Sequence, residues 1–336
     1  MGVSTMQLWH TIENLENALE KLLTDGKNIL ISGDSGIGKS QIFAQVCKRK
    51  GKTLEIIPAY DYGEFITGLP KVNSVVTSFT KAEWVHNVLS NKPDVILFED
   101  AHLIRPEYLN HFYTTLLERQ FQGSQLPPES IIVMIGNWGV DSAMYNDIPA
   151  PIMGRIDYCF NFIPNPDLWI KWGKENGIHE YVLNYIDMFK NDFVRTTNFN
   201  EISISPRKWE KFSNDLKSGL SEELYECSIG IDLATKFKDF SSTFTYSLDD
   251  ILKSDFNMLN ENQKIGLVVV LALKYNYKTD SRILQFIKNL DEDKQTLWVS
   301  CTINKLKTEE QPYFVLELKQ ILPQLYDIYV KKEKLK

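Results

Sequence analysis

A glycine-rich stretch of eight residues, GDSGIGKS, constrains this chain more than any other feature of its sequence. It covers Gly33–Ser40 and matches the pattern G-x-x-x-x-G-K-[ST]. The apolar run NILIS (28–32) precedes it, and QIFAQVCKRK (41–50) predicts a helix that stops at Gly51. A strand, a glycine loop and a helix in this order cradle phosphate, because backbone N–H groups at the helix start point at an anion. The alternative is a chance match to the pattern.

The residues of this loop have different predicted tasks. Glycines let the backbone approach a phosphate closely. We expect Lys39 to reach the β- and γ-phosphates of ATP, and Ser40 to hold Mg²⁺. The candidate nucleotide-binding residues are Gly33, Asp34, Ser35, Gly36, Ile37, Gly38, Lys39, Ser40 and Gln41.

Two adjacent acids, Glu99 and Asp100, end a second apolar run, VILF (95–98). Four apolar residues in a row predict a strand that is buried on both faces. Such a strand seldom ends in carboxylates unless a partner faces them, and ligands of a parallel sheet bind at the carboxyl ends of its strands. We therefore expect Glu99 to hold Mg²⁺ through a water molecule and Asp100 to orient the attacking water. An ordinary pair of acids on a surface turn is the alternative.

Strand patterns and helix patterns alternate over the first 160 residues or so. This alternation predicts an α/β fold with a parallel sheet whose faces are both covered. The predicted strands are 28–32, 54–58, 94–100 and 131–137, with a further strand after residue 155 and a possible hairpin at 71–78. The predicted helices are 13–23, 41–50, 81–90 and 106–120.

The pattern changes after FIPNPD (162–167), and helical periodicity dominates to the end of the chain. We predict three domains: an α/β nucleotide-binding core over 1–164, a helical lid over 165–241, and an all-helical C-terminal extension over 242–336. The stretch FSSTFTYSLDD (240–250) is a candidate linker within the helical part.

Three further polar residues are candidates for the site. Asn137 ends the predicted strand IIVMIGN, where an amide can touch the γ-phosphate or its attacking water, although asparagine also starts turns. Arg155 comes just before the next strand, and Arg207 follows Ser205 and Pro206 near a helix start. Arginine suits bidentate contact with phosphate oxygens, but either arginine could equally be an ordinary surface residue.

Composition narrows the possible partners. The net charge of −7 and the lack of a basic stripe argue against nucleic acid, and the Lys-rich tail VKKEKLK is read as a solvated end. The four cysteines are far apart and in no zinc-binding spacing, and no signal peptide or membrane span is visible, so we expect a cytoplasmic protein. The five histidines show no metal-ligand spacing, and His102 is the only one near the predicted acids.

Residues 28 to about 213 resemble a MoxR-type AAA+ ATPase, of the subgroup commonly paired with proteins that carry a von Willebrand factor A domain. The resemblance rests on the order and spacing of several motifs besides the glycine loop. They read GLPKV (68–72), LFEDA (97–101), GN (136–137), IPAPIMGRI (148–156) and PRKW (206–209). The stretch DLWIKWGKENGIHEYVLNYI (167–186) is also similar to that subgroup.

The resemblance implies roles that the residues alone do not show. Asn137 would be a sensor of the γ-phosphate, Arg155 a finger on the neighbouring subunit's nucleotide, and Arg207 a sensor that reaches its own subunit's nucleotide from the lid. Such proteins form rings, usually hexamers, with inserts that here would occupy 59–80 and 120–128. Many work with a von Willebrand factor A partner to remodel or activate a protein client.

One feature of this chain departs from that family. In the family, the pair of acids at the end of the second strand of the site, called the Walker B motif, is Asp followed by Glu, whereas this chain has Glu99 followed by Asp100. The departure puts the turnover rate in doubt. The function best supported by the sequence is that of a ring-forming, ATP-hydrolysing remodelling chaperone with ATP and Mg²⁺ as ligands and no membrane partner. Two alternatives are a nucleic-acid-dependent motor or loader, and a nucleotide-gated scaffold that hydrolyses ATP slowly.

Overall fold

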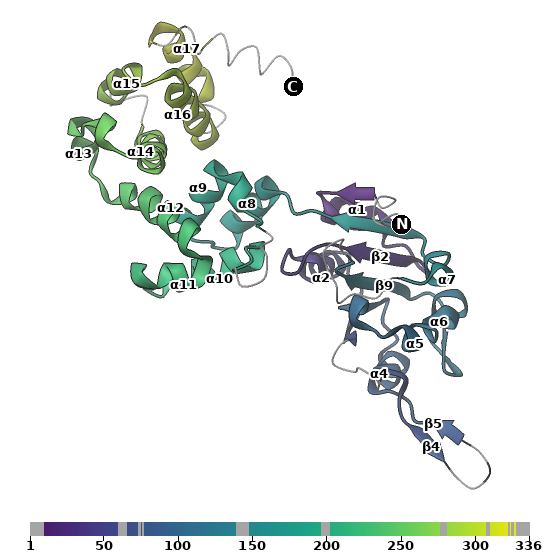
Figure 1. Cartoon of the computed structure of the whole chain (residues 1–336). Coiled ribbons are helices and arrows are strands. Elements are labelled where there is room, and N and C mark those ends of the chain that lie inside the picture. The colour runs from purple at the N-terminus through teal and green to yellow at the C-terminus, as the bar shows by residue number, and fades with distance from the viewer. Residues whose placement is uncertain are drawn as a thin grey trace, which may run out of the picture. The chain divides into compact units, whose positions relative to one another are not determined.

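The computed structural model describes residues 10–59, 66–72, 75, 77–138, 148–195, 202–275, 281–306, 310–321, 323 and 326. The chain divides into two compact units. The first comprises Met1–Trp169 together with Ser205–Lys208, and the second comprises Ile170–Ile204 together with Trp209–Lys336. Figure 1 shows both units, with many of their helices and some of their strands labelled.

A six-stranded parallel sheet forms the centre of the first unit, in the order β1-β10-β2-β9-β6-β3. The apolar runs of β2, β6 and β9 form its middle, and every residue of these three strands is buried except Glu99. The strands are β1 (His10–Ile12), β2 (Asn28–Ser32), β3 (Leu54–Pro58), β6 (Val95–Glu99), β9 (Ile131–Gly136) and β10 (Tyr158–Phe162). The carboxyl ends of β2, β9 and β6 therefore lie at one edge of the sheet.

Both faces of this sheet are covered, which explains the unbroken apolar runs of its central strands. In β2, Ile29 and Ile31 belong to one hydrophobic cluster and Leu30 belongs to another, as the alternation of side chains along a strand requires. The first cluster includes residues of α1 (Leu15–Leu22) and α2 (Lys39–Arg49). The second includes residues of α4 (Glu83–Asn91), α5 (Pro106–Leu109) and α6 (Phe112–Glu118).

The first unit differs from the sequence prediction in two places. The predicted helix 106–120 is two short helices, α5 and α6, and α6 ends where Arg119 adopts a left-handed backbone with a φ of 54°. Strand β1 was not predicted, because its three residues HTI are too few to show a pattern and become a strand by pairing with β10.

Two antiparallel hairpins extend the first unit. The predicted hairpin at 71–78 is confirmed as β4 (Pro70–Val72) with β5 (Thr77–Phe79), and Figure 1 shows it projecting from the core beyond α4. The insert expected at 120–128 contains β7 (Gln120–Phe121) paired with β8 (Ser124–Gln125). Much of the other expected insert, at 60–65, lies outside the described residues. The remaining short elements are η3 (Ala101–Leu103) and α7 (Ala150–Met153).

The rest of the described chain is helical apart from one isolated antiparallel bridge, between Arg195 and Ile204. The elements up to residue 245 are α8 (Pro166–Glu175), α9 (Glu180–Met188), η4 (Lys190–Asp192), α10 (Pro206–Lys217), η5 (Glu222–Leu224), α11 (Tyr225–Ile229), α12 (Ile231–Ser242) and η6 (Thr243–Thr245). Those that follow are α13 (Leu248–Lys253), η7 (Phe256–Met258), α14 (Glu261–Lys274), α15 (Ser281–Lys288), α16 (Glu292–Lys305) and α17 (Gln311–Ile321).

Two groups of buried aromatic rings mark the interior of the helical unit. Tyr185 packs with Trp209 and with Phe237, and further along the chain Trp298 packs with Tyr275. The candidate linker 240–250 is largely helical, because Phe240 and Thr243 are buried where a linker would be exposed.

The predicted fold class is confirmed: a P-loop α/β core on a parallel sheet is followed by helices, the arrangement expected from the resemblance to AAA+ proteins. The domain boundaries at 164 and 241 stay predictions. None of the helices in the described ranges has the length and apolar character that crossing a membrane requires.

Candidate nucleotide site

The glycine loop joins the carboxyl end of β2 to the start of α2. Gly36 and Gly38 have φ values of 76° and 93°, which residues with a Cβ rarely adopt. Helix α2 begins at Lys39, and Gly38 before it has no side chain to cap the first turn. The N–H groups of that turn are therefore available to an anion, as a phosphate cradle requires.

Lys39 lies between the loop and the two acids. Its Nζ donates hydrogen bonds to the carbonyl oxygens of Gly33, at 2.6 Å, and Asp34, at 2.7 Å. Burial lowers the pKa of Lys39 from its ordinary value to about 8, although the carboxylates of Asp100, Asp34 and Glu99 oppose this shift. Lys39 therefore shares one electrostatic environment with the acids that end β6.

Ser40 is joined to Glu99 directly. The hydroxyl of Ser40, in the first turn of α2, donates a hydrogen bond of 2.5 Å to Oε1 of Glu99, the last residue of β6. The two strands that lead to these residues are separated by β9, so the contact spans the carboxyl edge of the sheet. The structure thus brings the two candidate Mg²⁺ residues together.

Asp100 occupies a turn rather than the strand. Its φ of 53° lies in the left-handed region, and it precedes η3 as that helix's first flanking residue. Aspartate and asparagine adopt this conformation more readily than most residues with a side chain. Glu99 and Asp100 are therefore not equivalent: Glu99 is fixed by the strand and Ser40, whereas Asp100 leaves the strand on a sharp turn.

Asn137 directly follows β9, the strand between the P-loop strand and the strand of the acids. Its neighbour Trp138 donates its backbone N–H to Oγ of Ser32, at 3.1 Å, which ties the end of β9 to the end of β2. The topology therefore places Asn137 at the same edge as Lys39 and Glu99.

Two aromatic residues that were not predicted as functional pack beside this edge. The rings of His102 and Trp138 meet edge to face, with centroids 6.0 Å apart. A Cβ added to Gly136 would lie 2.8 Å from the Trp138 ring and 2.9 Å from Nδ1 of His102, so only glycine fits there. Burial lowers the pKa of His102 below its ordinary value, and a neutral imidazole at pH 7 follows. The sequence signalled only the closeness of His102 to the two acids, and nothing in it marked Trp138.

Arg207 lies at the same loop. Its backbone N–H donates to the carbonyl oxygen of Gly36, at 3.0 Å. A Cβ on Gly36 would come within 2.6 Å of Oγ of Ser205, so the segment Ser205–Lys208 lies tightly against the glycine loop. The positive charge of Arg207 also contributes to lowering the pKa of Lys39. Sequence reasoning did not single out Ser205, since serine before proline reads as a helix start.

Arg155 lies at the opposite edge of the sheet. Its carbonyl oxygen accepts a hydrogen bond of 2.7 Å from Nδ2 of Asn28, the first residue of β2, whereas the glycine loop follows the last residue of that strand. The guanidinium donates to the carbonyl of Pro151, at 2.6 Å, and lies over the ring of Tyr113. Its buried Nε makes no hydrogen bond to the described residues. The structure thus separates Arg155 from its own subunit's P-loop.

Arg119 is a further buried arginine at this amino edge. It is 7% exposed and donates four hydrogen bonds, to the carbonyl oxygens of Gly26, Thr115, Leu116 and Ser130. Burial lowers the pKa of Arg119 below its ordinary value. Its role is structural, because it holds the end of α6 against the turn before β2.

Comparison with known proteins adds little to these observations. No protein-family model and no curated protein matches the chain. Among solved structures, the chain is similar to a replication initiator DnaA bound to AMPPCP and single-stranded DNA, at 15% identity over 98% of this chain and 96% of that one, with a TM-score of 0.38. It is also similar to a DNA replication initiation factor, at 16% identity over 96% and 97% of the two chains, with a TM-score of 0.36.

A third solved structure is a lysine-to-arginine mutant of RuvB from Thermotoga maritima, at 10% identity over 71% of each chain, with a TM-score of 0.36. At such TM-scores these likenesses give no information about the function of the chain.

Proposed function

We propose that this chain is an AAA+ ATPase that binds Mg·ATP at the glycine loop and hydrolyses it. The observation that carries the proposal is the hydrogen bond from Ser40 to Glu99, with Lys39 and the segment of Arg207 at the same loop. A hydroxyl, a carboxylate and a lysine meet at the carboxyl edge of a parallel sheet, which is the arrangement that a nucleoside triphosphate with its metal ion requires.

The donor set suits a hard, oxygen-binding cation such as Mg²⁺. Ser40, Glu99 and Asp100 offer oxygen atoms only, and Mg²⁺ prefers oxygen ligands. The described residues contain no group of three or more histidine, cysteine, aspartate or glutamate side chains that could hold a metal ion alone. Such a site suits an ion that shares the phosphate oxygens of its substrate. When bound, Mg²⁺ neutralises charge on the transferred phosphate.

The remaining residues take the roles expected from their places. Lys39 binds the β- and γ-phosphates, Asp100 orients the attacking water, and Asn137 and Arg207 contact the γ-phosphate end. Arg155 acts on the nucleotide of a neighbouring subunit, which its place at the opposite edge supports. A finger that works in trans requires an adjacent subunit, and we propose that a hexameric ring supplies it.

The biological role is proposed from the motif resemblance. It is that of a MoxR-type chaperone, located in the cytoplasm, that remodels a protein client together with a von Willebrand factor A domain partner. A slow, nucleotide-gated scaffold is the second candidate, and it is favoured by one observation: Asp100 is a short acid on a left-handed turn rather than a glutamate at that place.

The first experiment compares ATP binding and hydrolysis in the parent chain and in Lys39→Ala. Loss of a charge-assisted phosphate contact should weaken ATP binding by about 2 kcal/mol or more. Lys48→Ala is the matched control, since Lys48 is an exposed lysine on the same helix. Equal ATP affinity of Lys39→Ala and the parent in a calorimetric titration would refute the P-loop assignment.

The same assay separates the alternative functions. Hydrolysis that rises strongly with single- or double-stranded DNA would point to a nucleic-acid motor, whereas tight binding with little turnover would point to the scaffold. For the chaperone, we expect a von Willebrand factor A protein to copurify with the chain and to stay bound to the nucleotide-loaded ring.

A further inference from the structure

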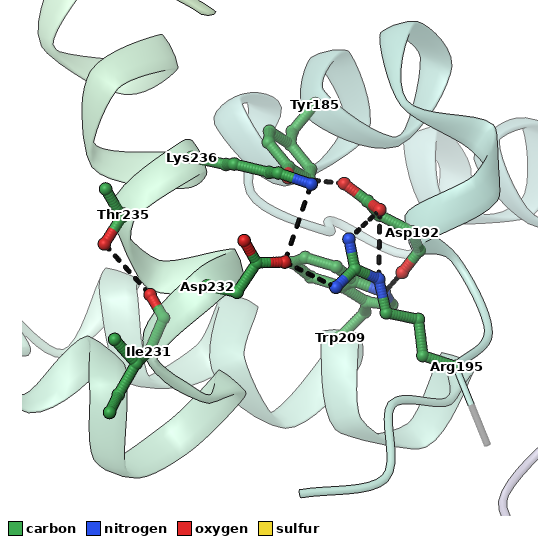
Figure 2. A network of polar contacts seen from close by, with 8 residues as sticks. All are labelled: Tyr185, Asp192, Arg195, Trp209, Ile231, Asp232, Thr235 and Lys236. Atoms are coloured by element: carbon green, nitrogen blue, oxygen red, sulfur yellow. Dashed lines mark hydrogen bonds and ion pairs between the residues drawn. The ribbon is translucent and has the colours of Figure 1, made fainter. Parts of the chain in front are cut away.

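An ion-pair network around a buried aspartate lies in the helical unit and includes none of the residues assigned above (Figure 2). Asp192, the last residue of η4, is only 6% exposed. Its carboxylate accepts a hydrogen bond of 2.7 Å from the hydroxyl of Tyr185 and one of 3.0 Å from Nε of Arg195. Arg195 also donates from Nη1 to Asp232 of α12, at 2.7 Å. A buried carboxylate needs such partners, and removing one leaves a charge that is costly to bury.

This network holds the chain on both sides of the Arg207 segment. On the N-terminal side, Arg195 and Ile204 exchange two backbone hydrogen bonds of 3.0 Å each. On the C-terminal side, the indole N–H of Trp209 donates to the carbonyl oxygen of Asp192, at 3.3 Å. Trp209 is fully buried beside the ring of Tyr185. Asp192 therefore contacts both anchors, Arg195 through its carboxylate and Trp209 through its backbone carbonyl.

The four residues between these anchors are Ser205–Lys208, which lie against the glycine loop through Gly36. They are joined covalently to Ile204 on one side and Trp209 on the other. We propose that Asp192 is a positioning residue for Arg207. Its carboxylate holds Arg195 and its backbone carbonyl holds Trp209, so that it fixes the two ends of the segment that presents Arg207 to the nucleotide, and Asp192→Asn tests the first of these two contacts. The inference rests on the proposed nucleotide site and adds a residue outside it.

The charged groups of the network join the two elements that carry Asp192 and Asp232. The planar guanidinium of Arg195 bridges two carboxylates on different elements, η4 and α12, and so joins these two elements. The hydrogen bonds to Asp232 and Asp192 outweigh the effect of burial and raise the pKa of Arg195. Lys236 adds a second, more exposed cation at 3.5 Å from Asp232.

The test uses the full chain and the variant Asp192→Asn, which keeps the shape of the side chain and removes its charge. The first readout is hydrogen exchange of the Arg207 amide without nucleotide, because this amide donates to Gly36. We expect its exchange to become about tenfold faster in Asp192→Asn, as local opening becomes easier. Unchanged exchange in a folded variant would overturn the inference, whatever the protein does with ATP.

The second readout is a double-mutant cycle with Arg207→Ala, measured as the preference for ATP over ADP. If Asp192 acts through Arg207, Asp192→Asn should reduce this preference roughly threefold to tenfold in the parent and leave it unchanged in Arg207→Ala. Equal effects in both backgrounds would mean that Asp192 acts independently of Arg207. If Arg207→Ala alone leaves the preference for ATP over ADP unchanged, Arg207 is not a sensor, and that part of the proposed function fails instead.

Two further variants control for general loss of stability. Tyr185→Phe removes one hydrogen bond from Asp192 but leaves both anchors, so both readouts should match the parent even if thermal unfolding shifts. Trp209→Phe removes the anchor on α10 alone and keeps a buried ring. If Asp192→Asn does not fold, Trp209→Phe takes its place, and parental exchange at Arg207 in that variant would equally overturn the inference.

Discussion

The hydroxyl of Ser40 donates a hydrogen bond to Glu99, and this contact joins the first turn of α2 to the last residue of β6. The two residues are 59 positions apart in the sequence. They meet because β2 and β6 are parallel and flank the same strand, β9, so that both strands end at one edge. The contact fixes Glu99 beside the glycine loop and leaves Asp100 to follow the turn, which makes the two acids chemically different.

The charge of Lys39 gives the site a predictable pH dependence. Because burial lowers its pKa to about 8, Lys39 is charged below that pH and loses its proton as the pH rises through it. A bound phosphate stabilises the charged form of Lys39 and raises its pKa. ATP binding should therefore take up a proton near pH 8, and the affinity for ATP should fall towards higher pH.

Calorimetry of ATP binding in two buffers with different ionisation enthalpies measures this proton uptake. Lys39→Arg keeps its charge and should show none, and equal heats for the parent in both buffers would contradict the prediction.

Arg155 should act between subunits. Arg155→Ala subunits should bind ATP normally but fail to support hydrolysis in a neighbour, because Arg155 lies at the edge opposite its own glycine loop. Mixing them with Lys39→Ala subunits should restore part of the activity, since some interfaces then pair an intact loop with an intact finger. Arg105→Ala, at an exposed arginine of the same unit, is the control and should hydrolyse ATP at the parental rate. The hypothesis fails if mass spectrometry detects mixed rings and they remain inactive.

Asp100 should be required for hydrolysis but not for binding. Asp100→Asn keeps a residue that tolerates the left-handed backbone, so it removes the carboxylate with little strain. We expect tight ATP binding without turnover and a stable ATP-loaded ring, whereas Glu99→Gln should weaken Mg²⁺ dependence and ATP binding together. Single-turnover hydrolysis at the parental rate in Asp100→Asn would remove the water-orienting role from this residue.

The order of the two acids should slow the enzyme. A misplacement of about 1 Å in a catalytic group can cost about a hundredfold in rate, and Asp100 is one methylene shorter than glutamate. The double variant Glu99→Asp with Asp100→Glu should therefore hydrolyse ATP faster. It should also be less stable, by up to about 1 kcal/mol, because glutamate suits the left-handed turn less well. If the double variant hydrolyses ATP no faster than the parent, the inverted order of Glu99 and Asp100 does not slow hydrolysis.

Much of the core could be predicted because its signals are local. The glycine loop needs particular residues at fixed spacing. A strand buried on both faces is mostly apolar, as the ILI centre of β2 and the whole of β9 are. The two acids at the end of β6 were noticeable because charge at the end of such a strand is costly without a partner. These features belong to short stretches of sequence, so the fold class and the candidate residues around Lys39 followed from the sequence alone.

The tertiary structure decided what depends on partners far along the chain. Strand β1 exists because β10 pairs with it, and Arg119 is buried because four carbonyl oxygens converge on its side chain. The separation of Arg155 from the glycine loop follows from the direction of β2, and the contact of Asp192 with Arg195 and Trp209 follows from helix packing. A single arginine or aspartate in a sequence carries no sign of whether it will be solvated or buried, because that depends on which distant groups the fold brings within hydrogen-bonding distance.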